Sequence, residues 1–200
     1  NTQNTSNRET YDYNRISGKH DQENDMLSND YSNDYGLHTA GICLRTQRRK
    51  YNFALGITGQ VASLEGANAN VVKDSLINRQ FNNLLPNARF QYHFSKFKSL
   101  TVNYSAATNK PSISQLQPVP DNSNSLNIRT GNPDLKPEYN HTLQAQLNLV
   151  SPFRNKNQFW LFYLQTTQHK IVNADSIDAL GIKRTRPVNV NGVYNINSNI

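Results

Sequence analysis

The alternation of apolar and polar residues along the chain is the feature that most limits its possible folds. Successive side chains of a β-strand point to opposite faces, so a strand with one apolar face alternates with a period of two. Residues 51–61 show this pattern, and it returns less regularly at 36–47 and 158–168. We expect about seven strands and no helix. The clearest further examples are residues 88–94, 100–106, 142–149 and 188–197.

The connections between these segments alternate in length. Short turns near 48–50, 95–98 and 151–157 alternate with long segments at about 65–85, 108–138 and 168–186. Hairpins of a soluble sandwich have no reason to sort in this way, whereas a membrane barrel has short periplasmic turns and long outer loops. Strand length agrees, because a membrane-spanning strand needs about 9–11 residues. The pattern predicts an all-β fold, namely an incomplete run of consecutive strands of an antiparallel transmembrane β-barrel.

The composition fits a sheet with one face in contact with water. Hydrophobic residues make up 36% of the chain and its mean hydropathy is −0.75, which is low for a domain with a large packed core. The first 34 residues are polar, and no apolar run is long enough to cross a bilayer as a helix. We expect residues 1–34 to be a polar outer loop region and residues 35–200 to be a partial barrel domain, incomplete at both ends.

Aromatic residues stand near several of the expected strand ends. Tyrosine and tryptophan are enriched where a membrane protein crosses the lipid–water interface, and barrels carry aromatic girdles there. We expect an interfacial girdle made of Tyr35, Tyr51, Phe94, Phe97, Phe153 and Phe159.

Two prolines stiffen the chain just before the strand that begins near Tyr139. Pro133 and Pro137 fix their own φ near −65° and push the residue before each toward an extended conformation. Gly131 permits a positive φ. The segment is therefore expected to deliver the chain from a loop into the strand in a defined direction.

The same segment resembles a known signature. GNPDLKPE, residues 131–138, is similar to the NP-x-LKPE motif of TonB-dependent outer-membrane receptors, which precedes a strand descending from the outer surface. Over about residues 25–200 the chain resembles the outer-membrane β-barrel family of Bacteroidetes-type bacteria, which is related to those receptors. Supporting elements are LLP at 84–86, PSISQLQP at 111–118 and DNSN at 121–124, with Ser125 in place of the usual proline.

The resemblance implies a location in the outer membrane of a Gram-negative cell, in contact with outer-membrane lipid. It also implies a plug domain elsewhere in the parent chain, the TonB energy-coupling system as a partner, and an unknown nutrient as ligand. The leading hypothesis is therefore part of a receptor that transports a nutrient. The alternative is a soluble secreted β-sandwich adhesin or carbohydrate-binding module. We expect the loop at 108–138 to lie at the outer surface, more as a scaffold than as a ligand contact.

No motif in the sequence predicts catalysis. The G-x-S-x-G elbow, phosphate-binding glycine loops and Cys-His pairings are missing, and the single Cys43 excludes an internal disulfide. Asp21, Glu23 and Asp25 mimic the first ligands of a calcium loop, but Met26 stands where that loop needs glycine, so a solvated loop is preferred. We expect no enzyme activity, no cofactor and no metal site, and no residue is assigned to ligand binding. The histidines have no metal-ligand spacing and are expected in the lumen or at an interface: His20, His38, His93, His141 and His169.

The net charge of +7 raises the question of anionic partners. The densest basic cluster, RTQRRK at 45–50, coincides with an expected tight turn and is read as a solvated turn near the membrane interface. A nucleic-acid surface would interleave basic residues with stacking aromatics across one face. That organisation is missing here, so nucleic acid is not an expected partner.

Overall fold

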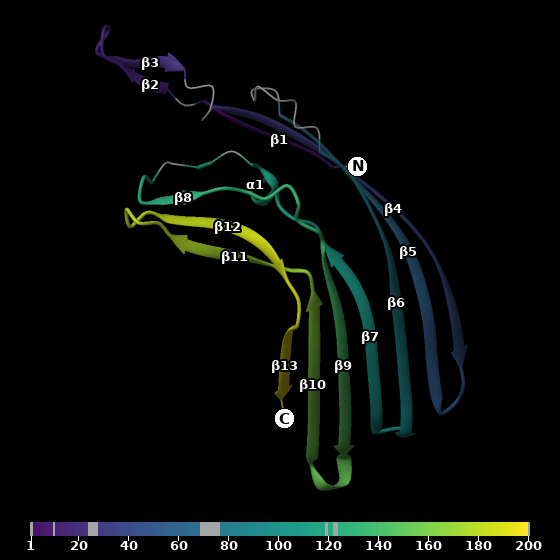
Figure 1. Ribbon diagram of the computed structural model, residues 1–200. Coiled ribbons are helices and arrows are strands. Elements are labelled where there is room, and N and C mark those ends of the chain that lie inside the picture. The colour runs from purple at the N-terminus through teal and green to yellow at the C-terminus, as the bar shows by residue number, and fades with distance from the viewer. Residues whose placement is uncertain are drawn as a thin grey trace.

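The computed structural model describes residues 2–9, 11–23, 28–68, 77–118, 120–121 and 124–199. Its main element is an eight-stranded antiparallel sheet in the order β1-β4-β5-β6-β7-β9-β10-β13 (Figure 1). The all-β prediction is confirmed, and β1 is a further strand that the sequence did not predict. The strands are β1 (Thr2–Arg8), β4 (Asn29–Gln47), β5 (Tyr51–Asn68), β6 (Ile77–Ser95), β7 (Lys98–Asn109), β9 (Glu138–Ser151), β10 (Lys156–Gln168) and β13 (Val193–Asn199).

Smaller elements surround this sheet. A three-stranded sheet has the order β11-β12-β8, with β12 and β8 parallel, and β2 pairs with β3 in a separate hairpin. Because β1 to β3 and the start of β4 precede residue 35, strand structure crosses the expected boundary, and the division into 1–34 and 35–200 stays a prediction. The bounds are β2 (Tyr11–Asn14), β3 (Lys19–Glu23), α1 (Ile113–Leu116), β8 (Asn127–Arg129), η1 (Pro152–Arg154), β11 (Lys170–Ile177) and β12 (Lys183–Val190).

The short connections gather at one end of the main sheet, as the sequence predicts. They span 48–50, 96–97 and 152–155, and Figure 1 shows all three at the bottom. The connections from β7 to β9 and from β10 to β13 leave the opposite end. Because short turns lie at one end and long connections at the other, the short-turn end and the opposite, outer end differ as they do in a membrane barrel.

Within the described part of the chain, no helix is both long and apolar enough to cross a membrane.

The expected long loop at 65–85 is wrong over most of its length. β5 continues to Asn68 and β6 begins at Ile77, so most of the segment is strand. With 18 and 19 residues, these strands are longer than the roughly 9–11 residues that cross a membrane. A membrane-spanning length covers only part of each strand. The outer parts then have no reason to alternate between apolar and polar residues, and periodicity cannot detect them.

The region 168–197 also differs from expectation. Most of the expected loop at 168–186 is an ordered β11–β12 hairpin, and the expected strand at 188–197 is divided between β12 and β13. The chain bends at Gly192, which has a φ of 81°. Beyond this bend, Val193 pairs with Thr167 and lies on the same face of β13 as Asn195 and Asn197.

The register aligns two faces across most of the main sheet. One row of directly paired residues is apolar, whereas the adjacent row on the other face is almost entirely polar. We call these the apolar face and the polar face. The apolar row contains Tyr51, Tyr92, Leu100, Leu147 and Trp160, and the polar row contains Arg45, Ala54, Arg89, Asn103, Gln144, Tyr163 and Asn197.

The apolar face is open to its surroundings. Ile42 is 78% exposed and Leu55 is 52% exposed. In a soluble β-sandwich such a face packs against a second sheet. Its exposure favours lipid contact and does not fit the β-sandwich alternative.

β10 resolves an ambiguity in the sequence, where residues 159–164 are apolar on both faces. Trp160 and Phe162 continue the apolar face, because they pair with Leu147 and Ala145. Phe159 lies opposite Asn148 and therefore belongs to the polar face. Phe159 is not a girdle residue, which corrects the expectation.

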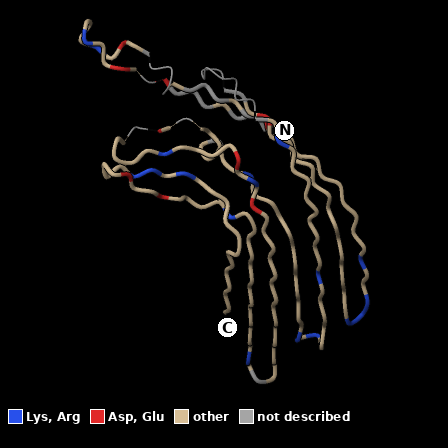
Figure 2. The backbone as a smooth tube through the Cα atoms, viewed as in Figure 1, with Lys and Arg blue, Asp and Glu red and all other residues tan. Residues whose placement is uncertain are grey.

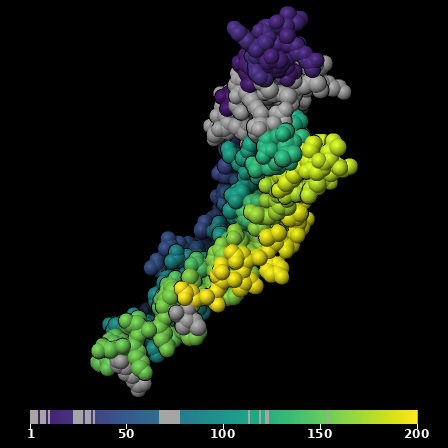
Figure 3. Space-filling view, turned by 90° about the vertical axis from the view of Figure 1, so that its left-hand side faces the viewer, coloured from purple at the N-terminus to yellow at the C-terminus, as the bar shows by residue number. Residues whose placement is uncertain are grey.

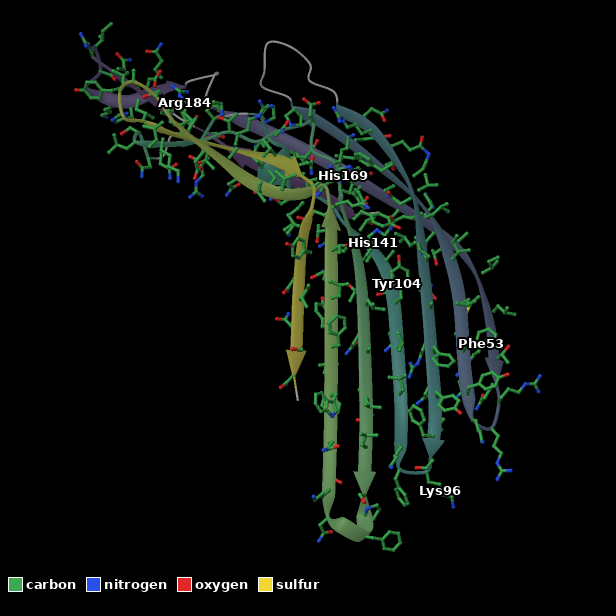
Figure 4. All side chains as sticks on the ribbon, turned by 60° about the horizontal axis from the view of Figure 1, so that its bottom comes forward. Phe53, Lys96, Tyr104, His141, His169 and Arg184 are labelled. Carbon is green, nitrogen blue, oxygen red and sulfur yellow. The ribbon has the colours of Figure 1, made fainter. Side chains whose placement is uncertain are left out.

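Tyr35 is likewise not part of a girdle. It packs against a buried cluster of Leu64, Leu116 and Leu135, and the Lys110 ammonium lies 4.6 Å from the centre of its ring. Tyr51, Phe94, Phe97 and Phe153 do lie exposed at the short-turn end. A second aromatic group, not predicted, lies at the outer end, where Tyr104 and His141 are neighbours (Figure 4).

The buried cluster joins the outer part of the sheet to the loops. Leu64 lies on the polar face of β5, whereas Leu116 comes from α1 and Leu135 from the proline segment. Leu116 and Leu135 are 0% and 1% exposed.

We call the described residues between 110 and 137, together with β11 and β12, the cap. The space-filling view shows the yellow-green hairpin against the teal segment of the cap (Figure 3). The cap therefore lies on the polar-face side of the sheet.

Candidate functional site

Amide and hydroxyl side chains make up much of the polar face. Asn87, Ser105, Thr142 and Gln165 form one paired row across β6, β7, β9 and β10. Glycines in β4 and β5 leave room for these side chains, because a Cβ at Gly56 would lie 2.6 Å from Asn87 Oδ1. In a barrel, this face lines a water-filled lumen or contacts whatever fills it.

From Pro86 to the outer end, the sheet divides into two layers, one with β5 and β6 and the other with β7 and β9. The outermost pair between β6 and β7 is Asn87 with Ser105, so Pro86 is the next residue outward and needs no hydrogen bond to β7. Proline has no backbone N–H and is tolerated where a ladder ends. The Tyr139 hydroxyl donates to the Leu84 carbonyl oxygen. The sequence predicts a loop to about residue 85 and a strand from 88, whereas residues 84–86 lie inside β6, where its pairing with β7 ends.

The layers above the division contact one another through polar groups. The Thr108 hydroxyl on β7 donates to Gln60 Oε1 on β5 at 2.7 Å. An ion pair joins Arg79 on β6 to Asp134 in the proline segment. The first contact holds β7 against the outer part of β5, and the second holds the cap against the outer part of β6.

Gly131 is required by a close approach of two backbones. An added Cβ would lie 2.2 Å from the Gln117 carbonyl oxygen and 2.7 Å from the Gln117 nitrogen. The Gly131 N–H also donates to that oxygen at 2.9 Å. The expected reason was a positive φ, but the described glycines with positive φ are Gly18, Gly181 and Gly192. The role of Gly131 is therefore space, which corrects the expectation.

Asn132 connects the proline segment to β12. Its Nδ2 donates to the Pro187 carbonyl oxygen at 3.0 Å, and its Oδ1 accepts from Arg186 Nη2 at 3.1 Å and from the Asp134 N–H at 3.1 Å. Asn189 completes the connection, because its Oδ1 accepts from the Lys136 N–H at 2.8 Å. These contacts support the expectation that the segment is a scaffold.

Glu138 anchors the base of the hairpin. The carboxylate accepts from the Ile171 N–H at 3.0 Å and forms an ion pair with Lys170 at 3.0 Å. The chain turns sharply between β10 and β11 at His169, a non-glycine residue with a φ of 53°. The Asn191 side chain accepts from the His169 N–H at 2.7 Å. The hairpin is thus fixed at both of its connections to the barrel strands.

The cap contains two polar cavities that share Thr130, Gly131 and Thr185 in their linings. One has a volume of about 480 Å³ and the other of about 630 Å³. The first is lined by hydroxyl, amide and charged side chains, which include Ser112, Gln115, Arg129, Asn173 and Thr185. Such a lining suits a polar solute, because sites of this size combine shape with a few directed hydrogen bonds. The sequence did not assign these residues, since they come from four distant segments.

The tip of the hairpin is held by Asp178. Its Oδ1 accepts from the N–H groups of Leu180 at 2.9 Å and Ile182 at 3.0 Å, and Arg184 Nη2 lies 3.3 Å from its Oδ2. The Ile182 N–H, followed by the Leu180 N–H and the Arg184 side chain, stabilises the carboxylate and holds the pKa of Asp178 below its usual value. Gly181 has a φ of 76° in this turn.

Replacing Asp178 with alanine is expected to loosen the hairpin tip without unfolding the barrel. The N–H groups of Leu180 and Ile182 lose their acceptor, so their exchange with deuterium should become several-fold faster in the complete protein. Asp175→Ala is the matched control, because Asp175 accepts from the Thr185 hydroxyl at 2.7 Å and pairs with Lys183 at 2.9 Å, away from the turn. Equal acceleration at the tip in both variants would contradict the role assigned to Asp178.

The remaining residues considered from the sequence stay apart. Of the acidic trio, Asp25 lies outside the described residues, Glu23 ends β3, and Asp21 is exposed in the same strand. Among the described residues, no group of three His, Cys, Asp or Glu side chains could hold a metal ion. His141 Nδ1 lies 2.8 Å from the Tyr104 hydroxyl on the apolar face. The other histidines are His20 in β3, His38 in β4, His93 on the polar face of β6, and His169 at the bend.

The chain matches the outer membrane protein beta-barrel family over residues 1–200, somewhat more than the 25–200 expected from its motifs. No curated protein matches it. The bacterial group of origin stays a prediction.

Two solved structures share its fold at low sequence identity. The copper transporter OprC is 12% identical with a TM-score of 0.57 over 94% of this chain. The siderophore receptor PirA from Pseudomonas aeruginosa is 9% identical with a TM-score of 0.52 over 84% of this chain. The aligned region spans 29% of the first structure and 38% of the second.

Proposed function

Because the chain belongs to the outer membrane protein beta-barrel family, we propose that it forms part of the wall and outer cap of a receptor that imports a nutrient. Its location is the outer membrane, and its barrel resembles those of TonB-dependent receptors. The proposal includes no catalytic role for these residues. It also includes a plug in another part of the parent protein and the TonB system as the source of energy.

The observation that carries the proposal is the position of the cap. A simple membrane anchor needs only an apolar face, but here a polar face runs across seven strands and the cap folds over its outer end. A solute that entered from outside would meet the cap before it reached the polar face. The 480 Å³ cavity supplies hydrogen-bonding groups at that position. We infer that the cap residues lining this cavity contact the ligand, although the sequence favoured a scaffold role for the loop at 108–138. The polar face then lines the path of the ligand or holds the plug.

The proposal is tested with the complete parent gene. Cells that carry it and cells that lack it are grown in one defined medium, and solutes left in the medium are quantified by mass spectrometry. We expect at least one solute to disappear only when the parent is present, and a protonophore to abolish this difference. If unboiled samples migrate as a compact, heat-modifiable outer-membrane species but no solute differs across media of varied composition, the transport proposal fails.

A further inference from the structure

Positive charge dominates the short-turn half of the sheet without acidic partners. Residues 36–64, 80–120 and 139–174 contain no Asp or Glu. Figure 2 shows the acidic residues at the outer end and in the cap, whereas Lys and Arg also occupy the short-turn end. The cations of this end are Arg45, Arg48, Arg49, Lys50, Arg89, Lys96, Lys98, Arg154 and Lys156.

The strand register places Arg45 and Arg89 on either side of one small residue. Arg45 on β4 and Arg89 on β6 both pair directly with Ala54 on β5. Adjacent strands lie about 4.8 Å apart, so the Cα atoms of the two arginines are separated by about 10 Å. Both side chains start from the polar face and are exposed. Only the Ala54 methyl group stands directly between them, so both guanidinium groups can reach one ligand.

The described part of the chain supplies no counter-charge for this pair. Among the described residues, the ion pairs involve Arg79, Lys170, Lys183 and Arg184, and neither Arg45 nor Arg89 takes part. Two cations on one surface repel each other, and a bound anion removes that repulsion. Guanidinium groups also hold carboxylates and phosphates through paired, charge-assisted hydrogen bonds.

Asn52 gives an independent indication that this part of the polar face is incomplete. Its Nδ2 donates to Gln91 Oε1 at 3.4 Å, but its buried Oδ1 has no hydrogen-bond partner. Asn52 and Gln91 lie on the polar face, each two residues along its strand from Ala54 or Arg89. Buried polar atoms are normally satisfied, so this oxygen marks a place where the described residues leave a hydrogen bond unmade.

We propose that Arg45 and Arg89 form an oxyanion-binding site on the polar face, near the short-turn end of the barrel. Its occupant carries a carboxylate or phosphate group. That group belongs either to a dissolved solute or to another part of the same protein that lies against this face. The site goes beyond nutrient uptake, because it depends only on the barrel register and its charges.

The test uses the complete parent protein in detergent. Its thermal unfolding midpoint is measured against inorganic phosphate, with chloride added to hold ionic strength constant. The double variant Arg45→Gln, Arg89→Gln is compared with Lys98→Gln, Lys156→Gln. The control removes the same charge from residues at the short-turn end that share the apolar face, because Lys98 pairs with Leu149 and Lys156 with Ser151.

For a solute site, phosphate raises the midpoint of the wild type and of the lysine variant. Its affinity for the arginine variant falls about tenfold or more, the size expected when charge-assisted hydrogen bonds are lost. Arg45→Lys, Arg89→Lys keeps the charge but not the paired geometry and is expected to fall between the two. For an internal carboxylate, phosphate has no effect, and the arginine variant unfolds at a lower temperature than the lysine variant.

Two results overturn the proposal. One is an equal phosphate effect on all the variants, which indicates general screening. The other is no phosphate effect together with equal midpoints for the arginine and lysine variants, because neither source of an oxyanion then depends on Arg45 and Arg89.

Discussion

Replacing Gly131 with alanine is expected to detach the proline segment from α1 while the barrel strands stay folded. The added Cβ meets backbone atoms of Gln117, which cannot move aside as the end of a flexible side chain can. Overpacking of this kind costs about 1–3 kcal/mol, and more where neither partner can shift. The contact lies beside the hydrogen bond from Asn132 N–H to the Gln115 carbonyl oxygen and near buried Leu135. Loss of this contact should therefore expose the buried cluster.

Deuterium exchange of the complete protein measures this effect segment by segment. We expect residues 112–117 and 131–135 to lose most of their protection in Gly131→Ala, whereas β9 and β10 keep theirs. Gly59→Ala is the matched control, because the nearest atom to its added Cβ is Ala40 O at 3.7 Å, an ordinary contact. Unchanged protection of the cap in Gly131→Ala would show that the two backbones can separate at little cost.

Strand positions could be predicted from the sequence only where lipid imposes a period of two. The polar-in, apolar-out rows of β5, β7 and β9 follow directly from the alternation in 51–61, 100–106 and 142–149. The positions of the three short turns follow from the same pattern, because they lie where the alternation stops. Beyond the apolar face the constraint disappears, which is why the outer parts of β5 and β6 and the whole of β1 were missed.

The cap depends on contacts that a single sequence does not display. Leu116 and Leu135 meet Leu64 although they are far apart along the chain, and no local pattern marks them as a core. The scaffold role of the proline segment could be predicted from the sequence, because the order imposed by Pro133 and Pro137 is local, and it stays a prediction. The sequence indicated that glycine is needed at Gly131 but gave a positive φ as the reason. The true reason is the close approach of the Gln117 backbone, a tertiary contact that the sequence does not display.

The two arginines illustrate the same limit for a site. Arg45 was grouped with Arg48, Arg49 and Lys50 as part of a turn, but it lies inside β4 on the polar face. Its proximity to Arg89 depends on the registers of β4 and β6 against β5, which alternation alone leaves undetermined by multiples of two residues. The absence of acidic residues from 36–64 and 80–120 was visible in the sequence and was the available signal.

Replacing Leu147 with arginine is expected to prevent the complete parent from forming a stable barrel. Leu147 lies in the middle of the apolar residues of β9, paired with Leu100 on β7 and Trp160 on β10. An arginine that faces lipid near the bilayer midplane costs about 2–4 kcal/mol in a membrane barrel. We expect a large decrease of the compact, heat-modifiable species in isolated outer membranes, measured by comparing unboiled and boiled samples on SDS gels.

Gln146→Arg is the control, one residue away on the opposite face. Gln146 pairs with Thr101 and Leu161 on the polar face, where an added arginine remains in water or against polar groups. The two variants carry the same new charge in the same strand, so a general effect of charge on export or expression lowers both equally. A selective loss in Leu147→Arg assigns the apolar face to lipid. Loss in Gln146→Arg alone would reverse the two faces, and the lumen, the cap and the arginine pair would then lie on the wrong side of the barrel.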